Sequence, residues 1–201
     1  DLSTLFSRDE NNHLTTDLSI NPSELAFNDS VWNIQHANVH YSDSIIVVEN
    51  FDIRHAEQYI NITGKVSPSP EDELCIDIKN LSLDYIFQTL EINNVTIGGD
   101  ATGKFYASEL FSKKPVAYTP KLYVKNISYN GTVFGDGLLD AHWDNERQAV
   151  NINADITQAN KLHSYINADI FPIKEALDLR FNANKLNASF MQPFMSGFAS
   201  S

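Results

Sequence analysis

Cysteine is nearly absent from this chain of 201 residues, which contains only Cys75. A single cysteine cannot form an intrachain disulfide, so the chain is not a secreted scaffold held together by disulfides. Long apolar runs are also absent. The longest, such as residues 45–48, is far shorter than the roughly 20 residues that cross a bilayer. Nothing in the sequence resembles a signal peptide.

Basic residues are in deficit, since 14 Lys and Arg face 26 Asp and Glu and give a formal net charge of −12. This balance excludes nucleic acid as a partner, because phosphate binding depends on clustered positive charge. It also disfavours electrostatic adsorption to an anionic bilayer. The hydrophobic content of 42% and aromatic content of 11% exclude disorder, so the chain is expected to fold around an apolar interior.

Polar and apolar residues alternate along most of the chain, which is typical of strands with one buried face. One face of each run is aliphatic, and the other carries Asn, Asp, Lys or Arg. Asn is an unusual choice because ordinary strands contain little of it. Turn signals such as Asn130-Gly131 separate the runs at short intervals. Clear examples are residues 59–63, 74–79, 150–156, 166–170 and 177–183. The sequence therefore predicts an all-β fold of repeated antiparallel strands.

Internal repeats support this prediction. The sequence Ile-Asn-Ala-Asp-Ile at 152–156 recurs at 166–170, a spacing of 14 residues. We expect two adjacent rungs that present the same face in the same register. Weaker repeats predict a β repeat unit over 1–107, a surface loop over 108–120 and a second, truncated β repeat unit over 121–201. One short helix is expected near 82–90 and a helical turn near 190–195.

No set of residues predicts an active site. His36 and His40 would lie about 13 Å apart on a strand, too far for one metal ion. The glycines at 98–103 lack the helix start that phosphate-binding loops require. Asp140, His142 and Ser164 have no nucleophile elbow beside them. We therefore predict no enzyme activity, no catalytic residue, no metal site and no cofactor.

The aliphatic strand face is the candidate binding surface. We expect it to form an apolar trough on one side of an open sheet. The same residues would form an ordinary core if the sheet closed into a β-sandwich, and the sequence leaves both possibilities open. The candidate residues are Ile60, Ile62, Ile76, Ile78, Ile152, Ile156, Ile166, Ile170, Leu177, Leu179 and Phe181.

A set of motifs in a fixed order resembles a known family. Trp32-Asn33-Ile34 comes first, and it is followed by the runs at 45–51, 58–64, 78–83, 98–103 and 126–131. Together they are similar to the translocation and assembly module family, the TamB-like proteins of the AsmA-like superfamily, in their Bacteroidetes-type form. The resemblance covers nearly the whole chain, and it implies a sheet that curls into a long open groove, the shape called a β-taco.

The resemblance implies a periplasmic segment of a larger protein, tethered to the inner membrane by an N-terminal part outside this chain. The implied function is phospholipid transport between the inner and outer membranes, outer-membrane protein assembly with an Omp85-class barrel partner, or both. Phospholipid acyl chains would suit an apolar trough, since each buried CH₂ contributes about 0.8 kcal/mol. The alternative is an interaction module that binds partner proteins by strand addition, without lipid transport.

Overall fold

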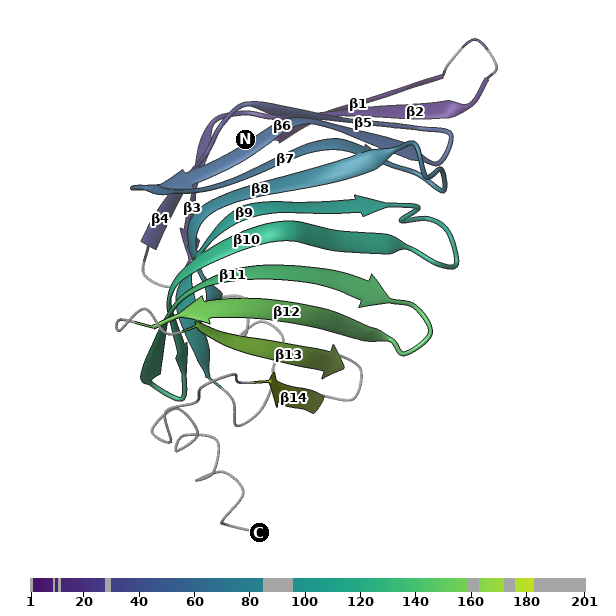
Figure 1. Ribbon diagram of the computed structural model, residues 1–201. Helices are drawn as coiled ribbons and strands as arrows, with labels where there is room; N and C mark the ends of the chain where they lie inside the picture. The colour runs from purple at the N-terminus through teal and green to yellow at the C-terminus, as the bar shows by residue number, and fades with distance from the viewer. Residues whose placement is uncertain are drawn as a thin grey trace. The chain divides into compact units, whose positions relative to one another are not determined.

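The computed structural model describes residues 2–8, 10, 12–27, 30–84, 96–158, 163–171 and 176–182. Within these ranges the regular structure is β-strand, except that Leu83 and Asp84 have helical geometry. This confirms the predicted all-β class (Figure 1). The strands are β1 (Leu2–Arg8), β2 (Leu14–Ile20), β3 (Ser23–Phe27), β4 (Ser30–Ile34), β5 (Ala37–Ser42), β6 (Ile45–His55), β7 (Gln58–Val66), β8 (Glu73–Ser82), β9 (Ile97–Ser108), β10 (Val116–Tyr129), β11 (Thr132–Asp144), β12 (Ala149–Thr157), β13 (His163–Phe171) and β14 (Ala176–Asn182).

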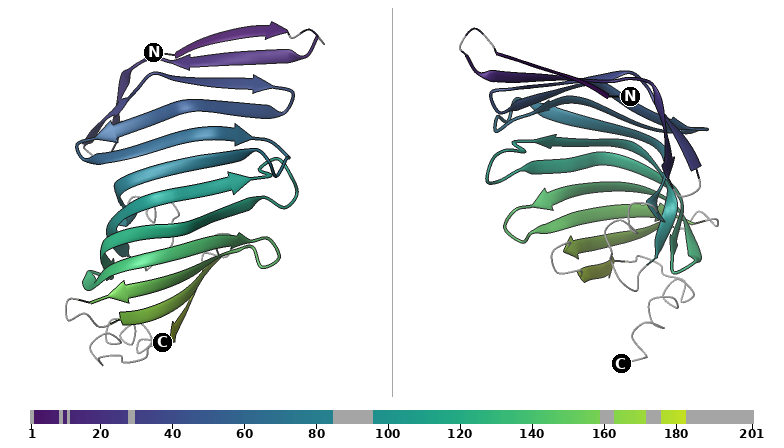
Figure 2. Two further views of the ribbon diagram at one scale, coloured as in Figure 1. Left: turned by 45° about the horizontal axis from the view of Figure 1, so that its top comes forward. Right: turned by 180° about the vertical axis from the view of Figure 1, so that it is seen from behind.

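All described strands belong to one open antiparallel sheet, in the order β1-β2-β5-β6-β7-β8-β9-β10-β11-β12-β13-β14. The β3–β4 hairpin joins it through β4, which pairs with β6. Strands that follow each other in sequence are therefore mostly neighbours, and the chain runs back and forth (Figure 2). No described strand forms a second sheet, so the fold is the expected open sheet and not the alternative β-sandwich.

The chain divides into two compact units. Unit 1 contains residues 1–81 and 104–118, and unit 2 contains residues 82–103 and 119–201. β9 ends at Ser108 and β10 begins at Val116, so the connection between them is shorter than the predicted loop at 108–120. Residues 116–120 belong to β10. They show the alternation of a strand, since Thr119 is buried while its neighbours Tyr118 and Pro120 are exposed. Residues 85–90 of the predicted helix, and the predicted turn at 190–195, lie outside the described residues.

In unit 1, cross-strand pairing keeps aliphatic residues opposite one another. Ile60 of β7 pairs with Ile53 of β6 on one side and with Ile78 of β8 on the other. Ile62 pairs likewise with Phe51 and Ile76. Because directly opposite residues point to the same face of an antiparallel sheet, these rows form an apolar face. The residues between them, such as Asn61, fall on the polar face.

A bulge in β6 corrects the alternation of this strand. Val48 pairs with Gly64 and Phe51 with Ile62, so β6 contains one residue more than β7 over this step. The extra residue allows Val48 and Phe51 to share the apolar face despite their odd spacing. Asn50 lies in the bulge with φ of 51°, and Asn80 and Asn126 have φ of 51° and 53°. Asn tolerates this left-handed region better than most residues, which is one reason for its use in these strands.

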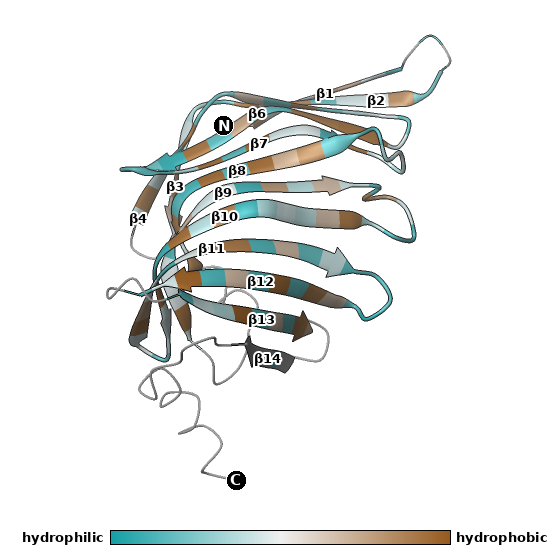
Figure 3. Ribbon diagram, in the orientation of Figure 1, coloured by the Kyte–Doolittle hydropathy of each residue, from teal (hydrophilic) through white to brown (hydrophobic). Residues whose placement is uncertain are grey.

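In unit 2, β11 to β14 pair in sequence order, and apolar and polar residues alternate along strands such as β12 (Figure 3). The two Ile-Asn-Ala-Asp-Ile copies lie on β12 and β13 and centre on the pair Asn153 and Asn167. Ile152 opposes Ala168, and Ala154 opposes Ile166. The copies do share a face, as expected, but the expected common register is wrong. Neighbouring strands run in opposite directions, so the copies are related by a two-fold rotation instead of a shift.

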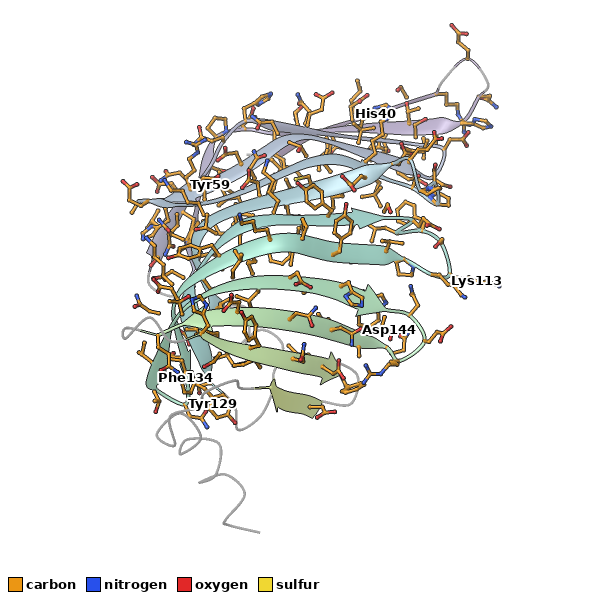
Figure 4. The ribbon with its side chains drawn as sticks, viewed as in Figure 1. His40, Tyr59, Lys113, Tyr129, Phe134 and Asp144 are labelled. Atoms are coloured by element: carbon orange, nitrogen blue, oxygen red, sulfur yellow. The ribbon has the colours of Figure 1, made fainter. Side chains whose placement is uncertain are left out.

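A hydrophobic cluster of unit 2 lies where β10 turns into β11. Phe134 and Ile156 are 8% and 2% exposed, and they pack with partly buried hydrophobic residues that include Tyr129 and Ile166. Tyr129 and Phe134 lie close together near the turn between β10 and β11 (Figure 4). This cluster anchors one end of the β12 and β13 rows that carry the repeated sequence.

Candidate functional site: the apolar sheet faces

The apolar face of unit 1 is defined by the register of β4 to β8. Its paired positions along these five strands are mostly aliphatic or aromatic, with Gln58 and Gly64 as exceptions, and Ile34 of β4 extends the row of Ile53, Ile60 and Ile78. The face consists of Trp32, Ile34, Val39, Ile46, Val48, Phe51, Ile53, Ile60, Ile62, Leu74, Ile76 and Ile78. Four of the eleven candidate residues predicted from the sequence, Ile60, Ile62, Ile76 and Ile78, therefore lie together.

Burial varies across this face. Ile78 is 2% exposed and behaves as core, whereas Ile60, Ile62 and Ile76 are only half-buried. A half-buried isoleucine still presents aliphatic surface to its surroundings. The face therefore combines the buried Ile78 with an accessible apolar surface beside it.

The other seven candidates lie on β12, β13 and β14 of unit 2. Ile152, Ile156, Ile166 and Ile170 share one apolar face, and the backbone positions of Leu177, Leu179 and Phe181 pair in register with those of Ile170, Ala168 and Ile166. Ile156 and Ile170 are buried, with 2% and 6% exposure. Ile152 and Ile166 are half-buried. The face thus has the same mixture of packed and accessible aliphatic residues as the apolar face of unit 1.

The polar face of unit 1 is tied together by paired charges. Arg54 donates from Nε and a terminal nitrogen to both carboxylate oxygens of Asp52, each at 2.8 Å. Hydrogen bonds from Arg54 lower the pKa of Asp52, and the Arg54 charge and a bond from Asn61 add to this, although burial acts in the opposite direction. Tyr59, labelled in Figure 4, donates to Asp77 at 3.2 Å. Asp77 also pairs with Lys104 at 3.3 Å.

The polar face of unit 2 carries a ladder of amides and carboxylates. The Asn167 amide donates to Oδ1 of Asn153 at 2.6 Å, and the Asn153 amide donates to Asp140 at 2.7 Å. Arg147 pairs with Asp169 at 2.6 Å on the same face. These acids are held by neighbouring donors, so they organise the sheet and do not converge on a shared point.

Residues that could suggest chemistry do not assemble within the described part of the chain. Ser164 pairs with Ile156 on the apolar face, whereas Asp140 and His142 lie on the polar face opposite Asn153 and Asn151. No group of three or more His, Cys, Asp or Glu among the described residues could hold a metal ion. Burial raises the pKa of the Cys75 thiol, which keeps it in the less nucleophilic protonated form.

Trp32 and His55 extend the apolar face of unit 1 at one end. Their ring centroids are 5.4 Å apart, and Nδ1 of His55 donates to the carbonyl of Val31 at 2.8 Å. Trp32 is 4% exposed, and its indole Nε1 has no hydrogen-bond partner among the described residues. Sequence reasoning did not include them in the site. Trp32 does precede Ile34 by two residues, but only the pairing of β4 with β6 brings it to Ile53 and His55.

Comparison with known proteins identifies no relative of this chain. Neither the protein-family models, nor the curated proteins, nor the solved structures contain a match to this chain. In the described residues, no helix has the length and apolar character needed to cross a membrane.

Proposed function

We propose that this chain binds the acyl chains of phospholipids on the apolar faces of its open sheet. The observation that carries the proposal is the absence of carboxylates from the paired positions of these faces. In unit 1, no paired position on the apolar face carries Asp or Glu, although the whole chain has 26 of them. The same holds for the paired positions of β11 to β14 in unit 2.

Acyl chains fit such a surface for energetic reasons. Each CH₂ group removed from water contributes about 0.8 kcal/mol and requires no directional polar contact. The half-buried Ile60, Ile62 and Ile76 of unit 1, with Ile152 and Ile166 of unit 2, provide the accessible part of each face. Neighbouring rows on a sheet lie about 4.8 Å apart, so a chain laid across the strands would meet one aliphatic row after another.

The proposed location and partners follow from the ordered motifs that resemble the TamB-like family. On this proposal, the chain is a periplasmic segment of a protein tethered to the inner membrane. It contributes to phospholipid transport between the inner and outer membranes and to outer-membrane protein assembly with an Omp85-class partner. The apolar faces support the lipid-binding part of this proposal, and the motif order supports the family assignment.

A second candidate function is strand addition, and β1 favours it. All seven residues of β1 are exposed, and within the described residues it pairs only with β2. Leu2, Leu5 and Phe6 are 64%, 63% and 66% exposed. β1 contains neither Pro nor Lys, which commonly protect edge strands from pairing with other chains. A partner strand could therefore extend the sheet at this edge.

Native mass spectrometry of the chain purified from a Gram-negative host tests the lipid proposal. We expect phospholipid adducts on the wild-type chain and on Thr63→Lys, which places its charge on the polar face. Ile62→Lys places the same charge among the aliphatic rows and is expected to lose most of the adduct, because burying an unpaired charge is costly. Wild-type chain without lipid, or equal adducts on both variants, would contradict the proposal.

A further inference from the structure

The unpaired indole nitrogen of Trp32 distinguishes one end of the apolar face of unit 1. The ring is 96% buried, since its exposed fraction is 4%, and its N–H finds no acceptor within the described residues. Buried donors in proteins are nearly always paired, because an unpaired one has lost its bonds to water without replacement. Trp143, the other tryptophan of the chain, follows this rule by donating to Asn145 at 3.2 Å.

Trp32 lies at the start of the aliphatic rows, so its indole N–H is next to them. Trp32 lies two residues before Ile34 on β4, and Ile34 starts the row that continues through Ile53 and Ile60. Leu25, the cross-strand partner of Trp32, is 46% exposed, so the buried indole is paired with an exposed apolar residue. The His55 ring, tied to Val31, packs against Trp32 and fixes its orientation.

The charges on this face favour a ligand that brings an acceptor. None of its paired positions in unit 1 carries a carboxylate, so an oxygen-rich anionic group would meet no like charge there. Asp52, the nearest acid along β6, lies on the opposite face and is occupied by Arg54. Glu24, which precedes Leu25 on β3, pairs with Asn33 and therefore also lies on the opposite face.

We infer that Trp32 is a head-group subsite, at which a phosphate oxygen of a bound phospholipid accepts a hydrogen bond from Nε1 while the acyl chain follows the aliphatic rows. This inference rests on the proposed lipid binding and adds a polar anchor to it. The indole gives the bound lipid a direction, with its head at the β4 end of the face and its tail toward β7 and β8.

Two detergents with the same twelve-carbon tail test the subsite below their micellar concentrations. Dodecylphosphocholine carries phosphate oxygens, and dodecyltrimethylammonium has no acceptor. For Trp32→Phe, we expect the Kd of dodecylphosphocholine to rise about tenfold, the usual effect of losing a hydrogen bond to a charged group. The Kd of dodecyltrimethylammonium should change less than twofold. Tyr59→Phe, which removes a hydroxyl donor on the polar face of unit 1, is the control and should leave both values unchanged.

The wild-type chain gives an independent measurement if Trp32→Phe fails to fold. In ¹⁵N-labelled protein, the indole N–H signal of Trp32 should shift downfield with dodecylphosphocholine and stay in place with dodecyltrimethylammonium. Binding of both detergents without this difference would overturn the subsite and leave lipid binding intact. Failure of both detergents to bind the wild-type chain would overturn the proposed function and the subsite together.

Discussion

The amide of Asn167 donates to the side-chain oxygen of Asn153 at 2.6 Å, and the two residues hold the same position in the two copies of Ile-Asn-Ala-Asp-Ile. They are directly opposite on β12 and β13, at the centre of the local two-fold relation between the copies. Around them, each isoleucine at the start of a copy faces the alanine of the other copy. The repeat therefore places a hydrogen bond on the polar face and a large residue opposite a small one on the apolar face.

Removing the Asn pair should destabilise unit 2 cooperatively. Asn167→Ala is expected to lower the free energy of unfolding by about 0.5–1 kcal/mol, the usual contribution of an exposed cross-strand pair. Asn153→Ala should cost more because Asn153 also donates to Asp140. Urea unfolding of the single and double variants measures the coupling. Strictly additive effects would show that the 2.6 Å contact contributes nothing to stability.

Packed and accessible positions on the apolar face of unit 1 should respond differently to truncation. Ile78→Ala removes a side chain that is 2% exposed and should cost about 2–5 kcal/mol of unfolding free energy. Ile62→Ala, at a half-buried position, should cost less than half as much. Denaturant midpoints of the two variants give the comparison. Equal large losses would identify Ile62 as ordinary core and remove it from the accessible surface.

Stability should depend on Asp52 at acid pH. Its pKa is lowered, chiefly by hydrogen bonds from Arg54, so the folded state favours the ionised form. The resulting stabilisation is complete above the unfolded value of about 3.9 and is lost as pH falls through the lower folded pKa. Asp52→Asn should be less stable at pH 7 and lose less stability between pH 5 and pH 2. Parallel pH profiles from thermal unfolding would contradict this assignment.

The strands of this fold could be predicted from sequence because their signal is local. The alternation at 59–63 and 150–156 is enough to assign both the strand and its apolar side. In the structure, most apolar residues of each run pair with apolar residues of the neighbouring strand, β8 or β13. The relation between the two repeat copies could not be predicted in the same way. A 14-residue spacing fits a shifted copy as well as a rotated one, and the direction of the neighbouring strand decides between them.

The candidate site was only partly predictable for a similar reason. Ile60 and Ile62 belong to a regular alternation, whereas Phe51 lies out of phase with Val48 because of the bulge at Asn50. Trp32 reaches the face through β4, a short strand that joins β6 beside β5. Such long-range pairings leave no periodic pattern in the sequence, so the Trp32 end of the face could be identified only from the structure.

Photo-crosslinking in cells tests the central claim, that the apolar faces bind phospholipid, most directly. A photoreactive amino acid at Ile62 or Ile152 reports on the apolar faces, and the same group at the adjacent Thr63 or Asn153 reports on the polar faces. The account predicts phospholipid adducts at Ile62 and Ile152 that clearly exceed those at Thr63 and Asn153. Equal lipid labelling at all four positions, or protein adducts alone, would contradict it.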